Sequence, residues 1–276
     1  MKILYLDCFS GISGDMTIGA LLDAGGDFSH LQKELQKLPL QDEYELKVHK
    51  IVKNGITSTK FDVILKNGKH VHSRHGHSKH IHKHSRDHDH KHHHHDEHDH
   101  HGHTHHHRSY RDIVKMIQEA DLSEKVKSIA LRIFKKIGEA EGCIHGVPLG
   151  DVHFHEVGAV DSIIDIVGTA ILIEELDIDD IKSAPVPTGS GKIHIDHGIY
   201  PVPAPATLEI LRGVPIAQSD LKAELTTPTG AAFAAVLANE FCDLPSMKVM
   251  KVGYGAGTKT FPDHPNVLRI ILGEQA

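Results

Sequence analysis

The stretch VHFHEVGAVDSIID combines the side chains that most often bind divalent transition metals in proteins. His153 and His155 lie on one side of an extended chain, because strand side chains alternate with period two. Asp161 and Asp165 are four residues apart, so a helix places both on one face near its start. With Glu156, these groups can hold a divalent ion that keeps open positions. The alternative is that the three carboxylates only favour a helix N-terminus and that hydrogen bonds satisfy the histidines.

A histidine-rich tract in the same chain favours the metal interpretation. The chain contains 28 histidines, of which 20 fall between His70 and His107. Four are consecutive: His92, His93, His94 and His95. Neutral imidazole suits nickel, zinc, copper and cobalt, and the affinity order favours Ni²⁺ and Cu²⁺. Many interchangeable ligands on a flexible chain exchange metal quickly, which suits storage or delivery better than catalysis. The alternative is a solvated linker that binds metal only incidentally.

The sequence DCFSGISGDM near the N-terminus predicts a glycine-rich loop between a strand and a helix. Such a loop exposes backbone N–H groups that can bind a phosphate or another anion, although it is neither a Walker A loop nor GxGxxG. The residues expected to contact such a ligand are Ser10, Gly11, Ser13 and Gly14. Asp7 and Asp15 flank them and can bind Mg²⁺. The alternative is a tight turn with Asp15 at a helix start.

A second candidate for anion binding is the sequence LTTPTG, which precedes an alanine-rich helical pattern. Thr227, Thr229 and Gly230 place hydroxyl groups and a flexible backbone position at a predicted helix start. Ordinary helix capping explains the same residues without a ligand, and the spacing alone favours capping.

The composition limits the protein classes that the chain can belong to. It has 276 residues with 39% hydrophobic and 24% charged residues, and a formal net charge of -7. The negative charge argues against a nucleic-acid-binding protein, and no apolar run is long enough for a transmembrane span. The N-terminus has no signal-peptide pattern. Three well-separated cysteines predict a reducing, cytoplasmic location.

Hydrophobic periodicity predicts an α/β fold, with a mixed α+β fold as the alternative. The expected elements are a strand at 3–6, a helix after Gly14, a hairpin around Asn54-Gly55, helices from Ser109, from Asp121 and over 160–175, helices from Ala204 and Thr229, and strands at 248–253 and 267–272. The tract has too few apolar residues to fold, so we expect it to be disordered. The chain then divides into an N-terminal lobe at 1–68, a disordered insert at 69–108, and a lobe at 109–276 that shares or abuts the same core.

Several of these segments together resemble one family, the nickel-insertion protein of the lactate racemase system, also described as the pyridinium-3,5-bisthiocarboxylic acid mononucleotide nickel chelatases. The resemblance lies in DCFSGISGDM, the internal histidine-rich insert, VHFHEVGAVDSIIDIVG, HGIYPVPAPATLEIL, ELTTPTGAA and GYGAGTKTFPDHPNVLRIILG. These stretches are long and cover nearly the whole chain.

The resemblance implies an enzyme of the lyase class that inserts Ni²⁺ into a pyridinium bisthiocarboxylate mononucleotide through two sulfurs and a carbon. It also implies CTP with Mn²⁺ or Mg²⁺, and lactate racemase as the recipient of the cofactor. In that setting the tract would gather nickel, and His153, His155, Glu156 and Asp161 would hold nickel or its helper ion. A general base must take the carbon-bound proton, and Asp7 and Asp15 are the best candidates.

One departure from the family pattern affects these expectations. Full-length members continue into a C-terminal domain associated with CTP binding, whereas this sequence ends at Ala276. We therefore expect the N-terminal part of a split protein, with a separate C-terminal polypeptide as partner and assembly into a homo-oligomer. Two other functions remain open at this point: a non-enzymatic nickel storage protein or metallochaperone, and a metal-dependent phosphohydrolase.

Overall fold

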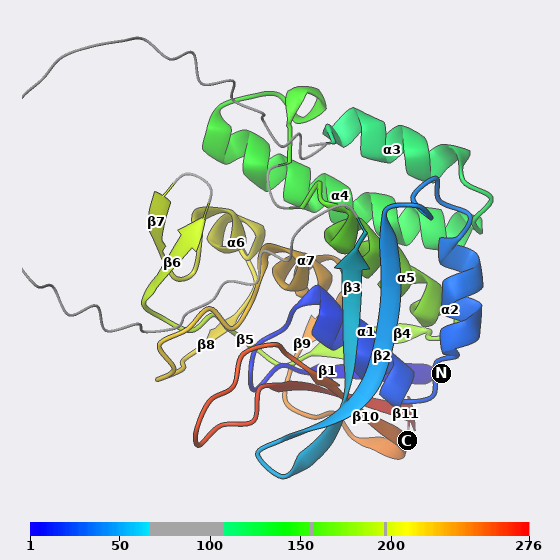
Figure 1. The fold of residues 1–276 in the computed structure, drawn as a ribbon. Coiled ribbons are helices and arrows are strands. Elements are labelled where there is room, and N and C mark those ends of the chain that lie inside the picture. The colour runs from blue at the N-terminus through cyan, green and yellow to red at the C-terminus, as the bar shows by residue number, and fades with distance from the viewer. Residues whose placement is uncertain (67–107, 155–156, 196–197, 276) are drawn as a thin grey trace, which may run out of the picture.

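The computed structural model describes residues 1–66, 108–154, 157–195 and 198–275 (Figure 1). The expected histidine-rich insert at 69–108, including the four consecutive histidines at 92–95, lies outside the described residues except for Arg108, which pairs with Glu43. So do two of the proposed metal ligands, His155 and Glu156. None of the described helices is both long and apolar enough to cross a membrane.

A seven-stranded mixed sheet forms the centre of the fold, in the order β2-β3-β10-β11-β1-β4-β9. Its strands are β1 (Lys2–Asp7), β2 (Tyr44–Lys53), β3 (Ile56–Leu65), β4 (Asp180–Ser183), β9 (Glu240–Phe241), β10 (Met247–Ala256) and β11 (Val267–Gln275). β1 pairs antiparallel with β11 and parallel with β4, both from beyond the histidine tract. The segments before and after the tract therefore contribute to one sheet, and the predicted α/β class is confirmed.

Two short strand pairs lie outside this sheet. β5 (Val186–Pro187) pairs with β8 (Ile216–Ala217), and β6 (Lys192–Ile195) forms a hairpin with β7 (Gly198–Pro201).

The helices are α1 (Gly14–Asp23), α2 (Phe28–Leu35), α3 (Tyr110–Glu119), α4 (Glu124–His145), α5 (Val160–Glu175), α6 (Pro205–Ile210) and α7 (Pro228–Leu237), with a 3₁₀ turn at Leu149–Asp151.

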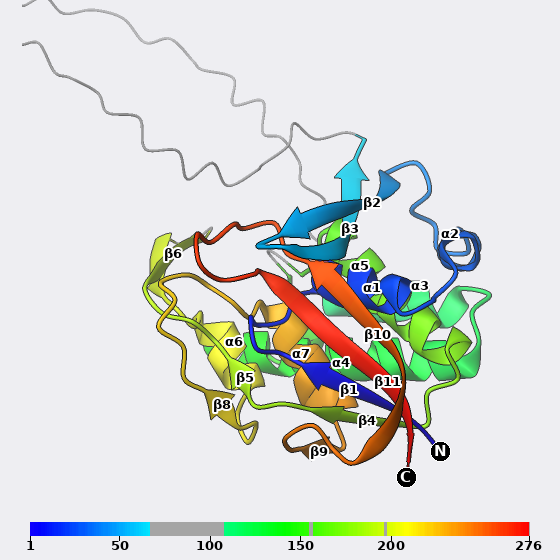
Figure 2. The ribbon, with the colours of Figure 1, turned by 90° about the horizontal axis from the view of Figure 1, so that it is seen from below.

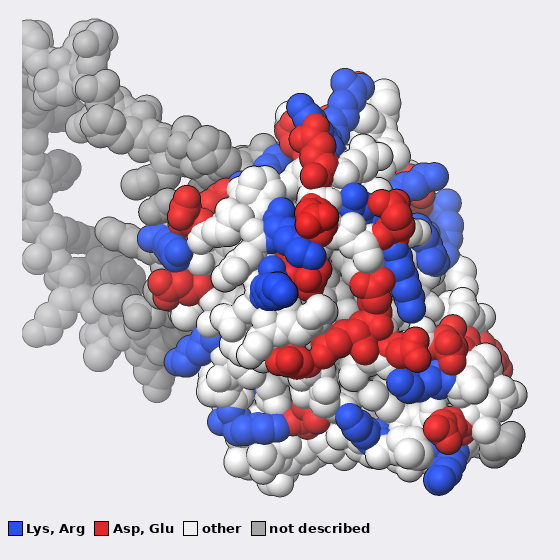
Figure 3. Space-filling model, turned by 90° about the vertical axis from the view of Figure 1, so that its right-hand side faces the viewer, with Lys and Arg blue, Asp and Glu red and all other residues white. Residues whose placement is uncertain are grey.

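The helices gather on one side of the sheet, as the view from below shows (Figure 2). α1 lies directly on β3 and β10, α5 packs behind α1, and α4 packs on α5, α6 and α7. α1 approaches the sheet closely because β10 contributes Gly255 at the contact: a Cβ there would lie 1.8 Å from the carbonyl oxygen of Met16. On the face that carries α2, acidic and basic side chains are interspersed (Figure 3).

The structure confirms most of the expected elements and corrects the start of one helix. Ser109 and Asp112 form the predicted capping box of α3. The next helix does not start at Asp121. Its N-cap is Ser123, whose hydroxyl accepts a hydrogen bond from the backbone N–H of Val126 at 3.1 Å. A hydroxyl at this position caps as well as a carboxylate does, so sequence alone did not separate the two starts.

Candidate functional site

The loop between β1 and α1 packs directly against the loop before α7. The backbone N–H of Thr227 donates to the carbonyl oxygen of Ile12 at 3.2 Å. A Cβ at Gly11 would lie 2.0 Å from the carbonyl oxygen of Leu225, and a Cβ at Gly230 would lie 1.9 Å from that of Ile12. Glycine at both positions therefore permits this backbone contact, and the structure brings the two predicted anion-binding loops together.

The starts of α1 and α7 are completed in different ways. Thr227 caps α7, because its hydroxyl accepts from the backbone N–H of Gly230 at 3.2 Å. The structure thus shows the helix capping that the LTTPTG sequence favours. Thr229, in the first turn of α7, is buried. Ser13 stands at the N-cap of α1 but makes no capping hydrogen bond; its hydroxyl donates to Asp15 at 2.5 Å. In the first turn of α1, the backbone N–H of Met16 instead donates to Asp15 Oδ1 at 2.9 Å.

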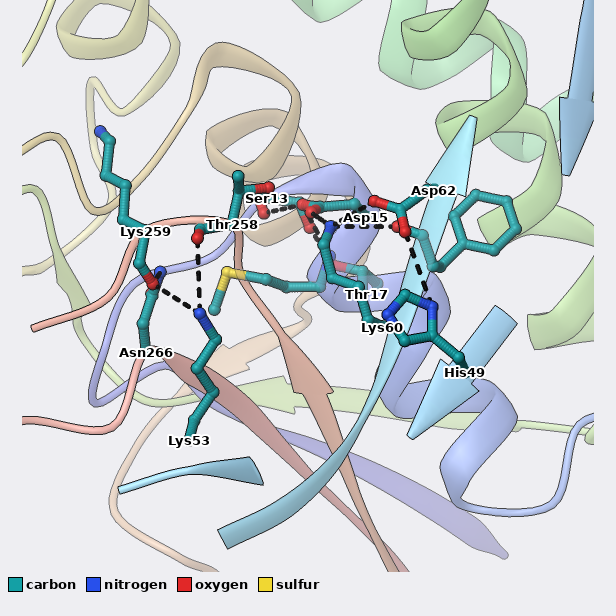
Figure 4. A network of polar contacts seen from close by, with 12 residues as sticks. Ser13, Asp15, Thr17, His49, Lys53, Lys60, Asp62, Thr258, Lys259 and Asn266 are labelled. Atoms are coloured by element: carbon teal, nitrogen blue, oxygen red, sulfur yellow. Dashed lines mark hydrogen bonds and ion pairs between the residues drawn. The ribbon is translucent and has the colours of Figure 1, made fainter. Parts of the chain in front are cut away.

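Asp15 lies at one end of a chain of charged groups that runs along β3 and β2 (Figure 4). The Lys60 Nζ donates to Asp15 Oδ2 at 2.5 Å and lies 3.2 Å from Asp62 Oδ1. Asp62 in turn lies 3.8 Å from the Nδ1 of His49. Lys60 is buried, which disfavours its charge, but the neighbouring carboxylates of Asp15 and Asp62 outweigh burial and raise the pKa of Lys60. The buried lysine therefore stays a cation beside Asp15.

Two further carboxylates approach Asp15 from α5. Asp165 lies against the start of α1: a Cβ at Gly14 would be 2.2 Å from its Oδ2. The Asp165 Oδ1 is buried and accepts no hydrogen bond from the described residues. Burial and then the charges of Asp15 and Asp161 raise the pKa of Asp165 well above its ordinary value. Desolvation also raises the pKa of Asp161, with a smaller contribution from Asp15.

An Asp165→Asn substitution is expected to stabilise the protein at pH 7. Because the pKa of Asp165 is higher in the folded protein than the ordinary 3.8, the folded state binds its proton more tightly than the unfolded chain. That stabilisation is complete below about pH 4 and is lost as the pH rises through the folded-state pKa. The asparagine variant cannot ionise, so its free energy of unfolding, measured by urea denaturation, should exceed that of the wild type at pH 7 and match it more closely at pH 4.

Asp112→Asn provides a control of opposite sign. Hydrogen bonds from Ser109 hold the pKa of Asp112 below its ordinary value, so its ionised form stabilises the fold above about pH 4 and this contribution is lost at lower pH. The Asp112→Asn variant should therefore be less stable than the wild type at pH 7. A loss of stability at pH 7 for Asp165→Asn as well would contradict the desolvation account of Asp165.

The structure separates Asp7 from Asp15. Asp7 pairs with Arg269, whose Nε donates to Asp7 Oδ2 at 2.7 Å. Asp7 and Arg269 are also direct partners in the register of β1 and β11, where Leu6 pairs with Ile270. Ile270 pairs in turn with Gly253 of β10, which faces α1. Because side chains alternate along a strand, Asp7 lies on the sheet face opposite α1 and Asp15.

The predicted metal ligands are only partly described. His153 is exposed, and its backbone forms an isolated bridge with Ser109. Among the described residues, no group of three histidine, cysteine, aspartate or glutamate side chains lies close enough to hold a metal ion. The proposed ligand set of His153 and Asp161 with its two undescribed partners therefore stays a prediction.

Sequence reasoning missed the basic residues of the site. The alternation that predicts the hairpin places Lys60 and Asp62 on one face of β3, but nothing in that pattern indicates that the start of α1 covers this face. A second missed residue is Lys53, which is buried and donates to the carbonyl oxygen of Lys259 at 2.9 Å and to the hydroxyl of Thr260 at 3.0 Å. Burial lowers the pKa of Lys53, and the nearby charge of Lys60 lowers it further.

Comparisons with known proteins bear on the whole of this chain. A family model described as "Nickel insertion protein" matches residues 4–276. A relative from Geobacillus kaustophilus (strain HTA426), named pyridinium-3,5-bisthiocarboxylic acid mononucleotide nickel insertion protein, is 53% identical over 278 aligned residues, which cover 100% of this chain and 60% of the relative. Relatives of the same name are 48% identical in Clostridium kluyveri and 45% identical in Staphylococcus epidermidis (strain ATCC 12228 / FDA PCI 1200), with 63% and 60% of their lengths covered.

The chain thus spans about three fifths of the length of these curated relatives. No solved structure matches it. The family match extends over nearly every described element, from β1 to β11, and includes both of the loops that contact each other around Ile12 and Thr227. The chain belongs to the nickel insertion protein family.

Proposed function

We propose that this chain carries the part of a nickel insertase that binds the pyridinium bisthiocarboxylate mononucleotide and introduces Ni²⁺ into it. The observation that carries the proposal is the meeting of two helix starts at Asp15. The N-cap residues of α1 and α5 make no side-chain capping hydrogen bond, although Asp15 and Asp161 each accept a hydrogen bond from the next backbone N–H at 2.9 Å. The start of α1 contacts the second turn of α5, where Asp165 lies against Gly14. Helix starts without caps bind phosphate groups through backbone N–H groups and the helix dipole.

The charges at this place suit the rest of the substrate. Carboxylates on α1 and α5 attract the divalent nickel ion, while the Lys60 cation attracts an anionic group. The protein need not supply a complete ligand set, because the substrate itself provides two soft sulfur donors. His153, His155, Glu156 and Asp161 remain our proposed holding site for nickel before its transfer, with the histidine tract, including His92 to His95, as the reservoir.

Nickel insertion replaces a ring C–H bond with a Ni–C bond, so one proton must leave the ring as the metal binds. We propose Asp15 as the base that takes this proton. It is 26% exposed, so it can reach a bound substrate. The Lys60 Nζ donates to its Oδ2 at 2.5 Å and so fixes the orientation of the carboxylate. Both aspartates contact a cation, but Asp7 lies on the sheet face opposite the helix starts, so we assign the proton transfer to Asp15.

Other parts of the reaction are proposed for regions beyond the described residues. The described residues offer no three-ligand group for a helper ion. We therefore place the binding of CTP and of Mn²⁺ or Mg²⁺ in the remaining two fifths of the relatives' length. Lactate racemase is the proposed recipient of the product, and a homo-oligomer is a further proposal. Free thiols at Cys8, Cys143 and Cys242 support a cytoplasmic location.

The test is to supply the mononucleotide, Ni²⁺, CTP and Mg²⁺ to the chain, with and without the polypeptide that completes the relatives' length, and to detect the nickel-containing product by mass spectrometry. A variant lacking residues 70–107 is run in parallel. An insertase should keep its turnover in this variant at saturating nickel and lose it only at scarce nickel. A storage protein or metallochaperone would form no product and would lose its nickel with the tract, and a phosphohydrolase would hydrolyse phosphate esters without the mononucleotide.

A further inference from the structure

Three aromatic side chains that take no part in the roles above lie in or beside the loop between β1 and α1. The ring centroid of His264 is 5.7 Å from that of Phe9 and 6.3 Å from that of Phe261, with interplanar angles of 58° and 60°. These are favourable tilted and edge-to-face contacts. Phe9 is 39% exposed, and the other two rings are partly exposed. The aromatic group of Phe9, Phe261 and His264 therefore presents accessible ring surface.

A hydrogen bond fixes this aromatic group to the candidate site. The Nε2 of His264 lies 2.9 Å from the hydroxyl of Ser10. Ser10 is fully buried and directly precedes the glycine that packs against the loop before α7. The three rings are consequently held next to the two loops that meet at the start of α1.

The segment between β10 and β11 carries two of the rings and is anchored on both sides. On one side, Lys53 donates to the carbonyl oxygen of Lys259 at 2.9 Å (Figure 4) and Asn54 donates to that of Pro262 at 2.7 Å. On the other side, the Lys259 Nζ donates to the carbonyl oxygen of Glu224 at 3.0 Å, just before the LTTPTG sequence. Rings held in place before a ligand arrives lose little freedom when it binds.

We propose that Phe9, Phe261 and His264 bind the pyridinium ring of the mononucleotide and select for its positive charge. This inference rests on the proposed function. A pyridinium ring is flat and cationic, so it can stack on an aromatic side chain and is also attracted by the negative face of the ring. A neutral ring of the same size gains only the stacking. The aromatic group would then distinguish a pyridinium nucleotide from nucleotides with neutral bases, while the helix starts hold the phosphate.

The experiment compares two ligands by calorimetry on the full chain. The first is the mononucleotide of pyridinium-3,5-dicarboxylic acid, and the second is an analogue in which a neutral benzene ring replaces the pyridinium ring. The variants are Phe9→Leu and Phe261→Leu, which keep an apolar side chain but remove the aromatic face. Phe9→Tyr keeps that face and serves as the matched control. Circular dichroism checks that each variant is folded.

We expect each leucine variant to bind the pyridinium ligand about 3- to 30-fold more weakly than the wild type does. The same variants should lose less affinity for the neutral analogue. Phe9→Tyr should bind both ligands as the wild type does. Equal losses for both ligands, or no loss for either, would overturn the role of the aromatic group while leaving the proposed function intact. If the wild-type chain binds neither ligand, the proposed function of this chain fails, and the aromatic inference fails with it.

Discussion

An Asp15→Asn variant should lose nearly all nickel insertion, with turnover falling by about 10²- to 10⁴-fold. Asparagine keeps the size of the side chain and can still accept the hydrogen bond from Ser13, but it cannot take a proton from the substrate ring. The measurement is single-turnover formation of the nickel-containing product, quantified by mass spectrometry under the complete assay conditions. Nickel binding is measured on the same samples, because the histidine tract should bind nickel whether or not Asp15 is present.

Asp62→Asn is the matched control, because Asp62 is the second carboxylate beside Lys60. This variant removes one partner of the lysine and leaves the contact between Lys60 and Asp15, so turnover should fall by less than about tenfold. A third variant, Asp7→Asn, breaks the pair with Arg269 and should lower stability more than turnover. The assignment of Asp15 is wrong if Asp15→Asn retains more than a tenth of the wild-type rate, or if Asp7→Asn is the variant that loses product formation.

A Gly230→Ala variant should be among the most destabilised single substitutions in the chain, by about 3 kcal/mol or more. The added methyl group would lie 1.9 Å from the carbonyl oxygen of Ile12 and 2.9 Å from the backbone nitrogen of Ser13. Both are backbone atoms, so they cannot rotate away as a side chain does. Relief requires α7 to move off the loop before α1, which also displaces the start of α1. The free energy of unfolding is measured by urea denaturation.

Ala235→Gly in the same helix is the control. Ala235 is partly exposed, and removing its methyl group costs about 1 kcal/mol through helix propensity alone. Gly230→Ala should also weaken mononucleotide binding in whatever fraction remains folded, whereas Ala235→Gly should leave the affinity unchanged. Equal stability of the two variants would show that the two loops do not pack as tightly as the structure places them.

The fold was largely accessible from the sequence because its strong signals are local. The Asn54-Gly55 turn and the alternation on either side of it predict the hairpin that the structure shows as β2 and β3. The capping box at Ser109 marks the start of α3 in the same way. The four-residue strand β4 was missed, because it is too short to show a period and is recognisable only from its parallel pairing with β1.

The candidate site was accessible only in part, because it is assembled from distant segments. The sequence predicted both loops and Asp15, but not that the backbones around Gly11 and Gly230 contact each other. It treated Asp7 and Asp15 as equivalent, although strand alternation and the Arg269 partner separate them. Lys60 carried no signal of its own, since a lysine in an alternating strand is usually a solvent-exposed residue.

The most direct test of the central claim is a titration of the wild-type chain with the pyridinium mononucleotide, followed through backbone amide resonances by NMR. The account predicts that the largest shifts occur at Gly14, Asp15 and Asp161, in the first turns of α1 and α5, and that the β6–β7 hairpin around Gly198 is unaffected. Saturable binding that leaves these three amides unchanged and shifts resonances elsewhere would contradict it, because the mononucleotide would then bind away from the helix starts that meet at Asp15.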